Sequence, residues 1–117
     1  MTPEGKVKKA VKEILNAYHP LVSHRWPVQN GMGKPMLDCV GCCCGLHFEI
    51  ETKATPKDEL TPRQEITKEE TEASLGKVFV IKATHDTDAL EEWLHQTVMR
   101  YKRKAKIYAE LGGDDVR

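Results

Sequence analysis

One stretch alternates apolar and polar side chains and determines the predicted fold: Leu46-His47-Phe48-Glu49-Ile50-Glu51-Thr52-Lys53. This two-residue period predicts a β-strand, because successive side chains of a strand point to opposite faces of a sheet. One face then carries Leu46, Phe48, Ile50 and Thr52, and the other carries His47, Glu49, Glu51 and Lys53. A polar face of this kind is often merely solvated, so its meaning depends on the residues that lie beside it.

The sequence around this strand predicts an α/β domain with the order α-β-β-β-α-β, a C-terminal helix and a mixed central sheet. Helices are expected over residues 2–18, 61–75 and 87–111, with capping residues at Thr2, at Thr61 and at Asp86 or Thr87. Strands are expected over residues 21–28, 36–44, 46–54 and 78–81. Glycines are placed at the turn between the second and third strands and after two of the helices: Gly45, Gly76 and the pair Gly112-Gly113.

The composition is that of one ordinary globular domain, taken as residues 1–117. The 18 basic and 18 acidic residues cancel, so an argument for nucleic acid must rest on local patches. No stretch approaches the roughly 20 apolar residues of a membrane span, and the N-terminus lacks the apolar run of a secretory signal. We therefore expect no membrane association and a cytoplasmic location.

Asp38 is placed to join the polar face of the central strand. It follows a glycine- and proline-rich loop, residues 29–35, and the short turn after it brings it beside Glu51. Two carboxylates on one face supply the oxygen ligands that a hard cation such as Mg²⁺ or Mn²⁺ prefers. Lys53 lies roughly 6–7 Å further along the strand, where its ammonium group can orient water or hold a phosphate. Metal, water and a cation beside the phosphate are the parts that phosphodiester hydrolysis needs.

These residues resemble the motif of the PD-(D/E)XK nucleases, as Pro35-Met36-Leu37-Asp38 followed by Glu51-Thr52-Lys53, although two residues separate the proline from the aspartate. More specifically, the chain resembles the stand-alone virus-type replication-repair nuclease (VRR-NUC) domains of phages and bacteria. Shared features are an early helical glutamate, a glycine-rich loop, an aspartate, an E-x-K strand and a helix opening with a glutamine: Glu4, Gly31-Met32-Gly33, Asp38, Glu51-Thr52-Lys53 and Gln64. The resemblance spans residues 2–81 and implies a restriction-endonuclease-like core.

The resemblance also implies roles for individual side chains. Asp38 and Glu51 would bind the metal with the Thr52 backbone carbonyl and Glu4, and the catalytic residues would be Lys53, Glu51, Asp38 and Gln64. Two of these keep an alternative. The helix dipole also favours a first-turn glutamate at Glu4, and Gln64 also fits a capping box with Thr61. Glu49 is a candidate supporting residue, for which a solvated side chain is the simpler interpretation.

Basic residues at several places are candidates for contact with DNA phosphates: Lys34, Arg63, Arg100, Arg103 and Lys104. The last three belong to a basic run on the final helix with Lys102 and Lys106, for which a solvated helix face is the alternative. The lysines of the first helix form a candidate second rim: Lys6, Lys8, Lys9 and Lys12.

Four cysteines lie too close together to connect distant parts of a fold: Cys39, Cys42, Cys43 and Cys44. With His47 they offer soft ligands for zinc. However, structural zinc sites usually join two separated ligand pairs, and neighbouring strand residues point apart. We expect reduced, metal-free thiols that act as small apolar side chains, with a zinc-binding interaction protein as the alternative.

The sequence therefore predicts a deoxyribonuclease that depends on Mg²⁺ or Mn²⁺. By resemblance, it would act as a homodimer on branched DNA such as Holliday junctions, in repair or recombination in a bacterium or a phage-infected cell. Nicking, flap cleavage and restriction-like cleavage are alternatives within the nucleases. A DNA-binding module without catalysis is an alternative of another class.

Overall fold

The computed structural model describes residues 1–112 and has the element order expected from the sequence. The elements are α1 (Pro3–Asn16), β1 (Val22–Arg25), β2 (Cys39–Cys43), β3 (Leu46–Thr52), α2 (Pro62–Ala73), β4 (Lys77–Ile81) and α3 (Asp88–Glu110). Thr2 and Thr61 cap the first two helices through their side chains, as expected. Gly113, which was expected to help end the last helix, lies outside the described residues.

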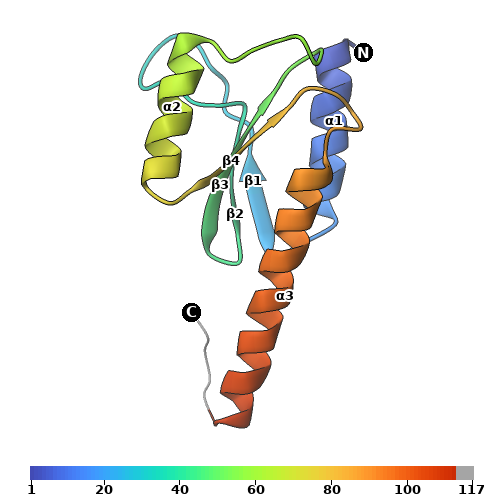
Figure 1. The fold of residues 1–117 in the computed structure, drawn as a ribbon, viewed down its shortest axis with the longest axis vertical. Coiled ribbons are helices and arrows are strands. Elements are labelled where there is room, and N and C mark those ends of the chain that lie inside the picture. The colour runs from blue at the N-terminus through green and yellow to red at the C-terminus, as the bar shows by residue number, and fades with distance from the viewer. Residues whose placement is uncertain (113–117) are drawn as a thin grey trace.

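The sheet is mixed and its strands follow the chain order β1-β2-β3-β4. The first three strands are antiparallel, and β4 runs parallel to β3 because α2 connects them. Figure 1 shows α2 on one side of the sheet and both α1 and α3 on the other. The predicted α/β class and the mixed sheet are thus confirmed.

The main core lies between the sheet and the two helices α1 and α3. Phe48 and Ile50 point into it from β3, as the alternation of the strand predicts. The helices contribute apolar stripes at helical spacing: Val7, Val11 and Leu15 from α1, and Leu90, Leu94 and Val98 from α3. The Phe48 ring lies against Gly41 of β2, where any Cβ atom would overlap it. Because Phe48 and Ile50 face this core, Glu49 and Glu51 point to the opposite face of β3.

Three boundaries differ from the sequence prediction. β1 and β2 are shorter than expected, because residues 26–38 form an unpaired loop in which Val28 is 92% exposed. Asp38 therefore lies in the bend just before β2, not within a strand. After α2 the left-handed residue is Leu75, with φ of 71°, and not Gly76. Gly76 is needed for a different reason, since a Cβ atom there would lie 2.7 Å from Thr71 Cγ2.

The last helix is longer than the sheet that it covers. Its first half packs on the sheet through Leu90, Leu94 and Val98, and its second half extends beyond the sheet (Figure 1). The molecule measures 50 × 29 × 21 Å as a result. Within residues 1–112, no helix has the length and apolar character that crossing a membrane requires.

Candidate metal and active site

Three carboxylates from separate elements meet at the C-terminal end of β3. They are Glu4 in the first turn of α1, Asp38 before β2 and Glu51 on β3, and their oxygens lie within 4.8 Å of one another. Glu51 is only 3% exposed. Among the described residues, this is the one group of three or more acidic, histidine or cysteine side chains close enough to share an ion.

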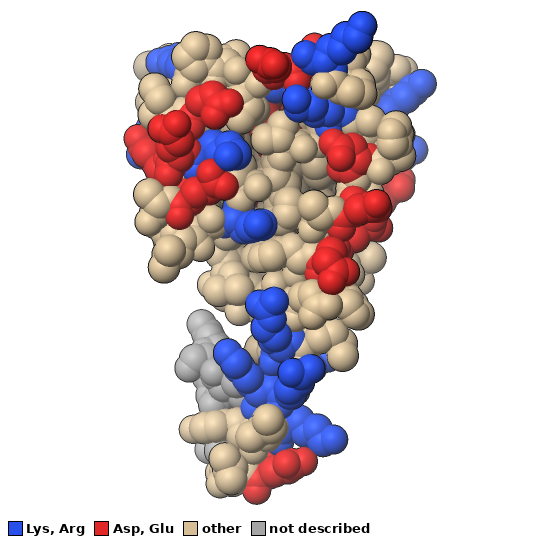
Figure 2. Space-filling view, viewed as in Figure 1, with Lys and Arg blue, Asp and Glu red and all other residues tan. Residues whose placement is uncertain are grey.

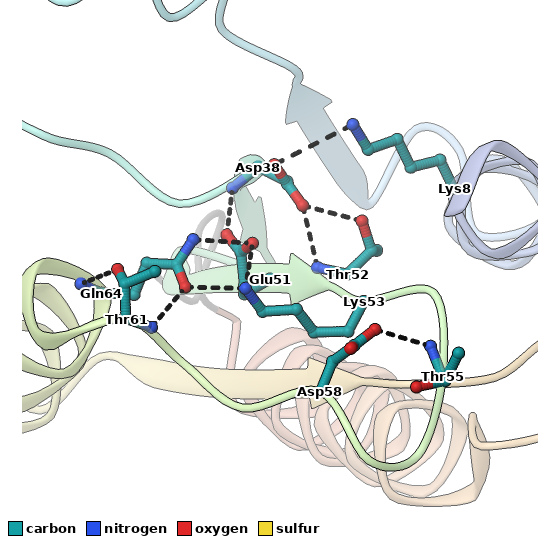
Figure 3. A network of polar contacts seen from close by, with 9 residues as sticks. All are labelled: Lys8, Asp38, Glu51, Thr52, Lys53, Thr55, Asp58, Thr61 and Gln64. Carbon is teal, nitrogen blue, oxygen red and sulfur yellow. Dashed lines mark hydrogen bonds and ion pairs between the residues drawn. The ribbon is translucent and has the colours of Figure 1, made fainter. Parts of the chain in front are cut away.

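Asp38 is held by β3 and in turn orients Glu51. The amide and the hydroxyl of Thr52 donate to Asp38 Oδ2 at 2.9 and 2.7 Å. The Asp38 amide donates to Glu51 Oε1 at 3.2 Å (Figure 3). Lys8 Nζ, one turn after Glu4 on α1, lies 4.0 Å from Asp38 Oδ1. Both carboxylates are therefore fixed in place by neighbouring backbone.

Burial beside a second carboxylate raises the pKa of Glu51 to about 7. Burial is the main cause and the nearby Asp38 carboxylate is the second, while Lys53 acts in the opposite direction. A buried carboxylate beside a second carboxylate ionises less readily, and a cation between the two removes that cost. The oxygen donors and the raised pKa of Glu51 therefore fit a hard divalent cation.

Lys53 and Gln64 complete the polar network beside Glu51. Lys53 Nζ lies 3.7 Å from Glu51 Oε2 and donates to Gln64 Oε1 at 2.9 Å. Gln64 Nε2 donates to Glu51 Oε2 at 3.0 Å, so one carboxamide contacts both groups (Figure 3). Gln64 Oε1 also accepts from the Thr61 amide, which completes the capping box at the start of α2. Gln64 therefore takes part in the capping box and also contacts Lys53 and Glu51.

Comparison with solved structures identifies the fold that carries this network. One structure described as a VRR_NUC domain matches with a TM-score of 0.67 and 25% sequence identity. The match covers 79% of this chain and 97% of that one. The chain has the VRR-NUC fold. No protein-family model matches the sequence, and a search of curated proteins also finds no match.

The VRR-NUC fold confirms the resemblance stated from the sequence, and with it the restriction-endonuclease-like core. The predicted site residues Glu4, Asp38, Glu51, Lys53 and Gln64 come together in one place, although they lie on four separate segments of the chain. The VRR-NUC architecture brings the N-terminus of α1 and the start of α2 to the same end of β3.

Glu49 is buried, whereas the simpler interpretation of the sequence was a solvated side chain. It is 8% exposed and not solvated, because the C-terminal half of α2 covers it. Thr71 Oγ1 donates to Glu49 Oε2 at 2.6 Å, and His47 Nε2 lies 2.8 Å from the same oxygen. Glu49 therefore attaches α2 to β3, while Gln64 does the same at the other end of the helix.

The candidate DNA-contacting residues fall into two separate places. Lys34 and Arg63 border a small hollow at the glycine-rich loop, and Lys34 pairs with Glu70 at 2.7 Å. Arg100, Arg103 and Lys104 lie instead on the second half of α3, which projects from the end of the molecule opposite the start of α1 (Figure 1). The fold does not bring this second group to the carboxylates.

The cysteines divide between core and surface as the strand alternation requires. Cys39 and Cys43 are fully buried in the core, and burial raises the pKa of each thiol to about 12. Cys42 and Cys44 are half-buried.

Two contacts in the site were not assigned from the sequence. Lys8 was grouped only with the other lysines of α1, although its spacing of four residues from Glu4 places both on one helix face. Thr52 was expected to face the core and to contribute its carbonyl. It is fully buried, and its hydroxyl also donates to Asp38, a contact that no pattern along the strand indicates.

Proposed function

We propose that this VRR-NUC-fold chain is a DNA endonuclease that depends on Mg²⁺ or Mn²⁺. The observation that carries the proposal is the Lys53 ammonium group held 3.7 Å from Glu51, beside a three-carboxylate cluster in a nuclease fold. Neither a stability role nor a simple solvated face accounts for a buried Glu51 carboxylate with a raised pKa beside two further carboxylates. Phosphodiester hydrolysis uses this combination of charges.

Glu4, Asp38 and Glu51 would hold the metal, together with the Thr52 carbonyl that the family resemblance adds. A bound divalent ion supplies a Lewis acid for the phosphate and lowers the pKa of an attacking water. The hydrogen bonds from Thr52 to Asp38 and from the Asp38 amide to Glu51 support this assignment, because they hold both carboxylates in place. Little reorganisation is then needed when the cation enters.

Lys53 would orient the attacking water or stabilise the charge that develops on the phosphate. Its side chain is 15% exposed, which leaves the ammonium group near the surface that a substrate approaches. Gln64 is a positioning residue, since it fixes Lys53 and Glu51 relative to each other. Arg63, next to Gln64 at the start of α2, and Lys34, which pairs with Glu70 further along that helix, would contact phosphates near the cut.

The proposed substrate is branched DNA, and the proposed assembly is a homodimer. One chain carries one site, whereas resolving a four-way junction needs two cuts in symmetry-related strands, which a two-fold dimer provides. Trp93 and Tyr101 are large aromatic residues of α3 that such an interface could use. The Trp93 ring packs edge-on against Phe48 and Phe79, with centroids 5.7 Å apart in each case, and Tyr101 is half-buried.

A cleavage panel tests this proposal. Four-way junctions, flaps, nicked duplex, linear duplex and single strands are incubated with Mg²⁺, Mn²⁺, Ca²⁺ or EDTA, and the mass in solution is measured by light scattering. We expect metal-dependent cleavage of the junction by a dimer. A monomer that cuts flaps would replace the junction with another branched substrate, and binding without cleavage in any metal would contradict the nuclease proposal.

A further inference from the structure

The charges of α3 are divided between its two halves. The first half carries Asp88, Glu91 and Glu92 and packs on the body of the protein. No acidic residue then occurs until Glu110, and five cations lie between: Arg100, Lys102, Arg103, Lys104 and Lys106. We call the part of α3 that carries these five residues the basic overhang. Figure 2 shows it as a dense group of blue side chains at the end of the molecule.

Interactions within residues 1–112 do not explain the basic overhang. Cations stabilise a helix dipole only in its last turn, and the last turn of α3 has no basic residue. In the part of the chain that the structure describes, none of the five cations takes part in an ion pair. All five are exposed. Like charges this close repel one another, so the cluster costs stability unless an anion binds it.

The arrangement of these cations fits a polyanion with regularly spaced charges. At about 100° per residue, the five side chains cover roughly half of the helix circumference. Thus Arg100 and Lys104 lie on one flank and Lys102 and Lys106 on the other, with Arg103 between them. A helix with cations on both flanks meets the phosphates on both walls of a DNA groove.

We propose that the basic overhang binds the phosphate backbone of a double-stranded DNA arm, at a distance from the phosphate that is cut. This inference rests on the proposed nuclease function and adds a requirement for its substrate. The overhang and the carboxylate cluster lie at opposite ends of a molecule 50 Å long. At about 3.4 Å per base pair, this length corresponds to roughly 15 base pairs. The arm therefore has to extend about one helical turn or more from the cut.

The first test measures binding without chemistry. Fluorescence anisotropy with labelled duplexes of about 10 and about 24 base pairs in EDTA compares the wild type with Arg100→Gln/Arg103→Gln/Lys104→Gln. Glutamine is a good helix former, so the overhang is expected to stay folded. We expect roughly 10- to 100-fold weaker binding of the long duplex and a salt slope smaller by about 2 to 3. The short duplex, which cannot contact both ends of the molecule at once, should bind more weakly than the long one to the wild type. Equal binding by both proteins would overturn the inference, whether or not the chain cleaves DNA.

A matched variant separates charge from shape. Arg100→Lys/Arg103→Lys keeps every positive charge and is expected to bind the long duplex as the wild type does. A loss of binding in both variants, measured on proteins with wild-type helicity, would overturn a role based on phosphate charge. Light scattering of the glutamine variant provides a further control. A change in mass would assign the overhang to contact with a second copy of the chain and would also overturn the inference.

The second test uses cleavage, so that the inference and the proposed function fail in different ways. Junctions with arms of about 8 and about 24 base pairs are cut by the wild type and by the glutamine variant. The variant is expected to raise KM on long arms about as much as it weakens duplex binding, with kcat unchanged. A fall in kcat with unchanged KM would contradict the inference. Absence of cleavage by the wild type would contradict the proposed function alone, because the binding test would still decide the role of the overhang.

Discussion

Gln64 Oε1 accepts a hydrogen bond from Lys53 Nζ at 2.9 Å, and this contact joins the start of α2 to the end of β3. The same carboxamide donates through Nε2 to Glu51 Oε2, so its oxygen faces a cation and its nitrogen faces a carboxylate. A side chain with two oxygens or with none cannot match both neighbours. The geometry of Lys53 and Glu51 thus depends on the identity of residue 64.

Gln64→Leu should lower kcat strongly and should lower the free energy of unfolding only slightly. Removal of the carboxamide frees Lys53 and Glu51 from their fixed separation, and we expect kcat to fall by roughly 10- to 100-fold. The free energy of unfolding should fall by about 1 kcal/mol through loss of the capping box. Single-turnover cleavage and urea unfolding measure the two effects separately.

Thr61→Ala is the matched control for this prediction. The Thr61 hydroxyl accepts from the Gln64 amide at 3.3 Å but does not contact Lys53 or Glu51. It should cost a similar amount of stability, about 1 kcal/mol, and keep most of the activity. Equal losses of activity in the two variants would assign Gln64 to helix capping alone.

Raising the pH should destabilise the metal-free protein through Glu51. The pKa of Glu51 is about 7 in the folded protein, against 4.5 for an ordinary glutamate. Its contribution is fully present below pH 4.5 and is lost as pH rises through 7. We expect a loss of about 3 kcal/mol from this group. Urea unfolding in EDTA between pH 4.5 and 8 measures the change.

Other groups titrate in the same range, so Glu51→Gln provides the comparison. This variant cannot ionise at position 51, and the pH-dependent fall assigned to Glu51 should be absent. The quantity to compare is the free energy of unfolding as a function of pH in the wild type and in Glu51→Gln. Parallel profiles for wild type and variant would show that Glu51 titrates normally.

Binding of the metal should release a proton below pH 7. The ion needs Glu51 as a carboxylate, whereas the empty site holds it protonated at lower pH. We expect affinity for Mn²⁺ to fall by up to about tenfold per pH unit below 7 and to level off above it. Calorimetry at pH 6 in buffers of different ionisation enthalpy counts the protons released. A constant affinity from pH 5.5 to 8 would be inconsistent with this site.

The predictable part of the site follows from the two-residue period of one strand. Glu51 and Lys53 share a face because they lie two residues apart, and the hairpin at Gly45 brings Asp38 back to Glu51. The bond from Thr52 to Asp38 was not predictable, since it depends on the bend of the chain before β2. Sequence periodicity describes residues within an element and not the direction of an unpaired loop.

Glu49 and the basic overhang show the same limit at a larger scale. Burial of Glu49 depends on where α2 docks, and α2 has only a weak apolar stripe, with Ile66 57% exposed. The run of basic residues on α3 was visible in the sequence. Its distance from the carboxylates was not, because that distance depends on how far the sheet extends beneath the helix.

The cysteines are expected to remain reduced and free of zinc. Cys39 and Cys43 are buried with pKa values of about 12, so they should resist thiol reagents at pH 8 until the protein unfolds. The half-buried Cys42 and Cys44 should be modified first. Thiol titration before and after adding urea, with zinc measured by mass spectrometry, tests both points. One tightly bound zinc per chain would favour an interaction protein.

The most direct test of the central claim is single-turnover cleavage of a labelled four-way junction in Mg²⁺ by the wild type and by Lys53→Ala. Asp38→Asn serves as a metal-site variant, and Lys77→Ala, at the opposite end of β4, serves as the matched lysine control. We expect Lys53→Ala to lose activity by roughly 10³-fold or more while keeping wild-type circular dichroism. Asp38→Asn should show a similar loss together with weaker metal binding, and Lys77→Ala should cut normally. Wild-type cleavage that persists in excess EDTA, or a fully active Lys53→Ala protein, would contradict the account.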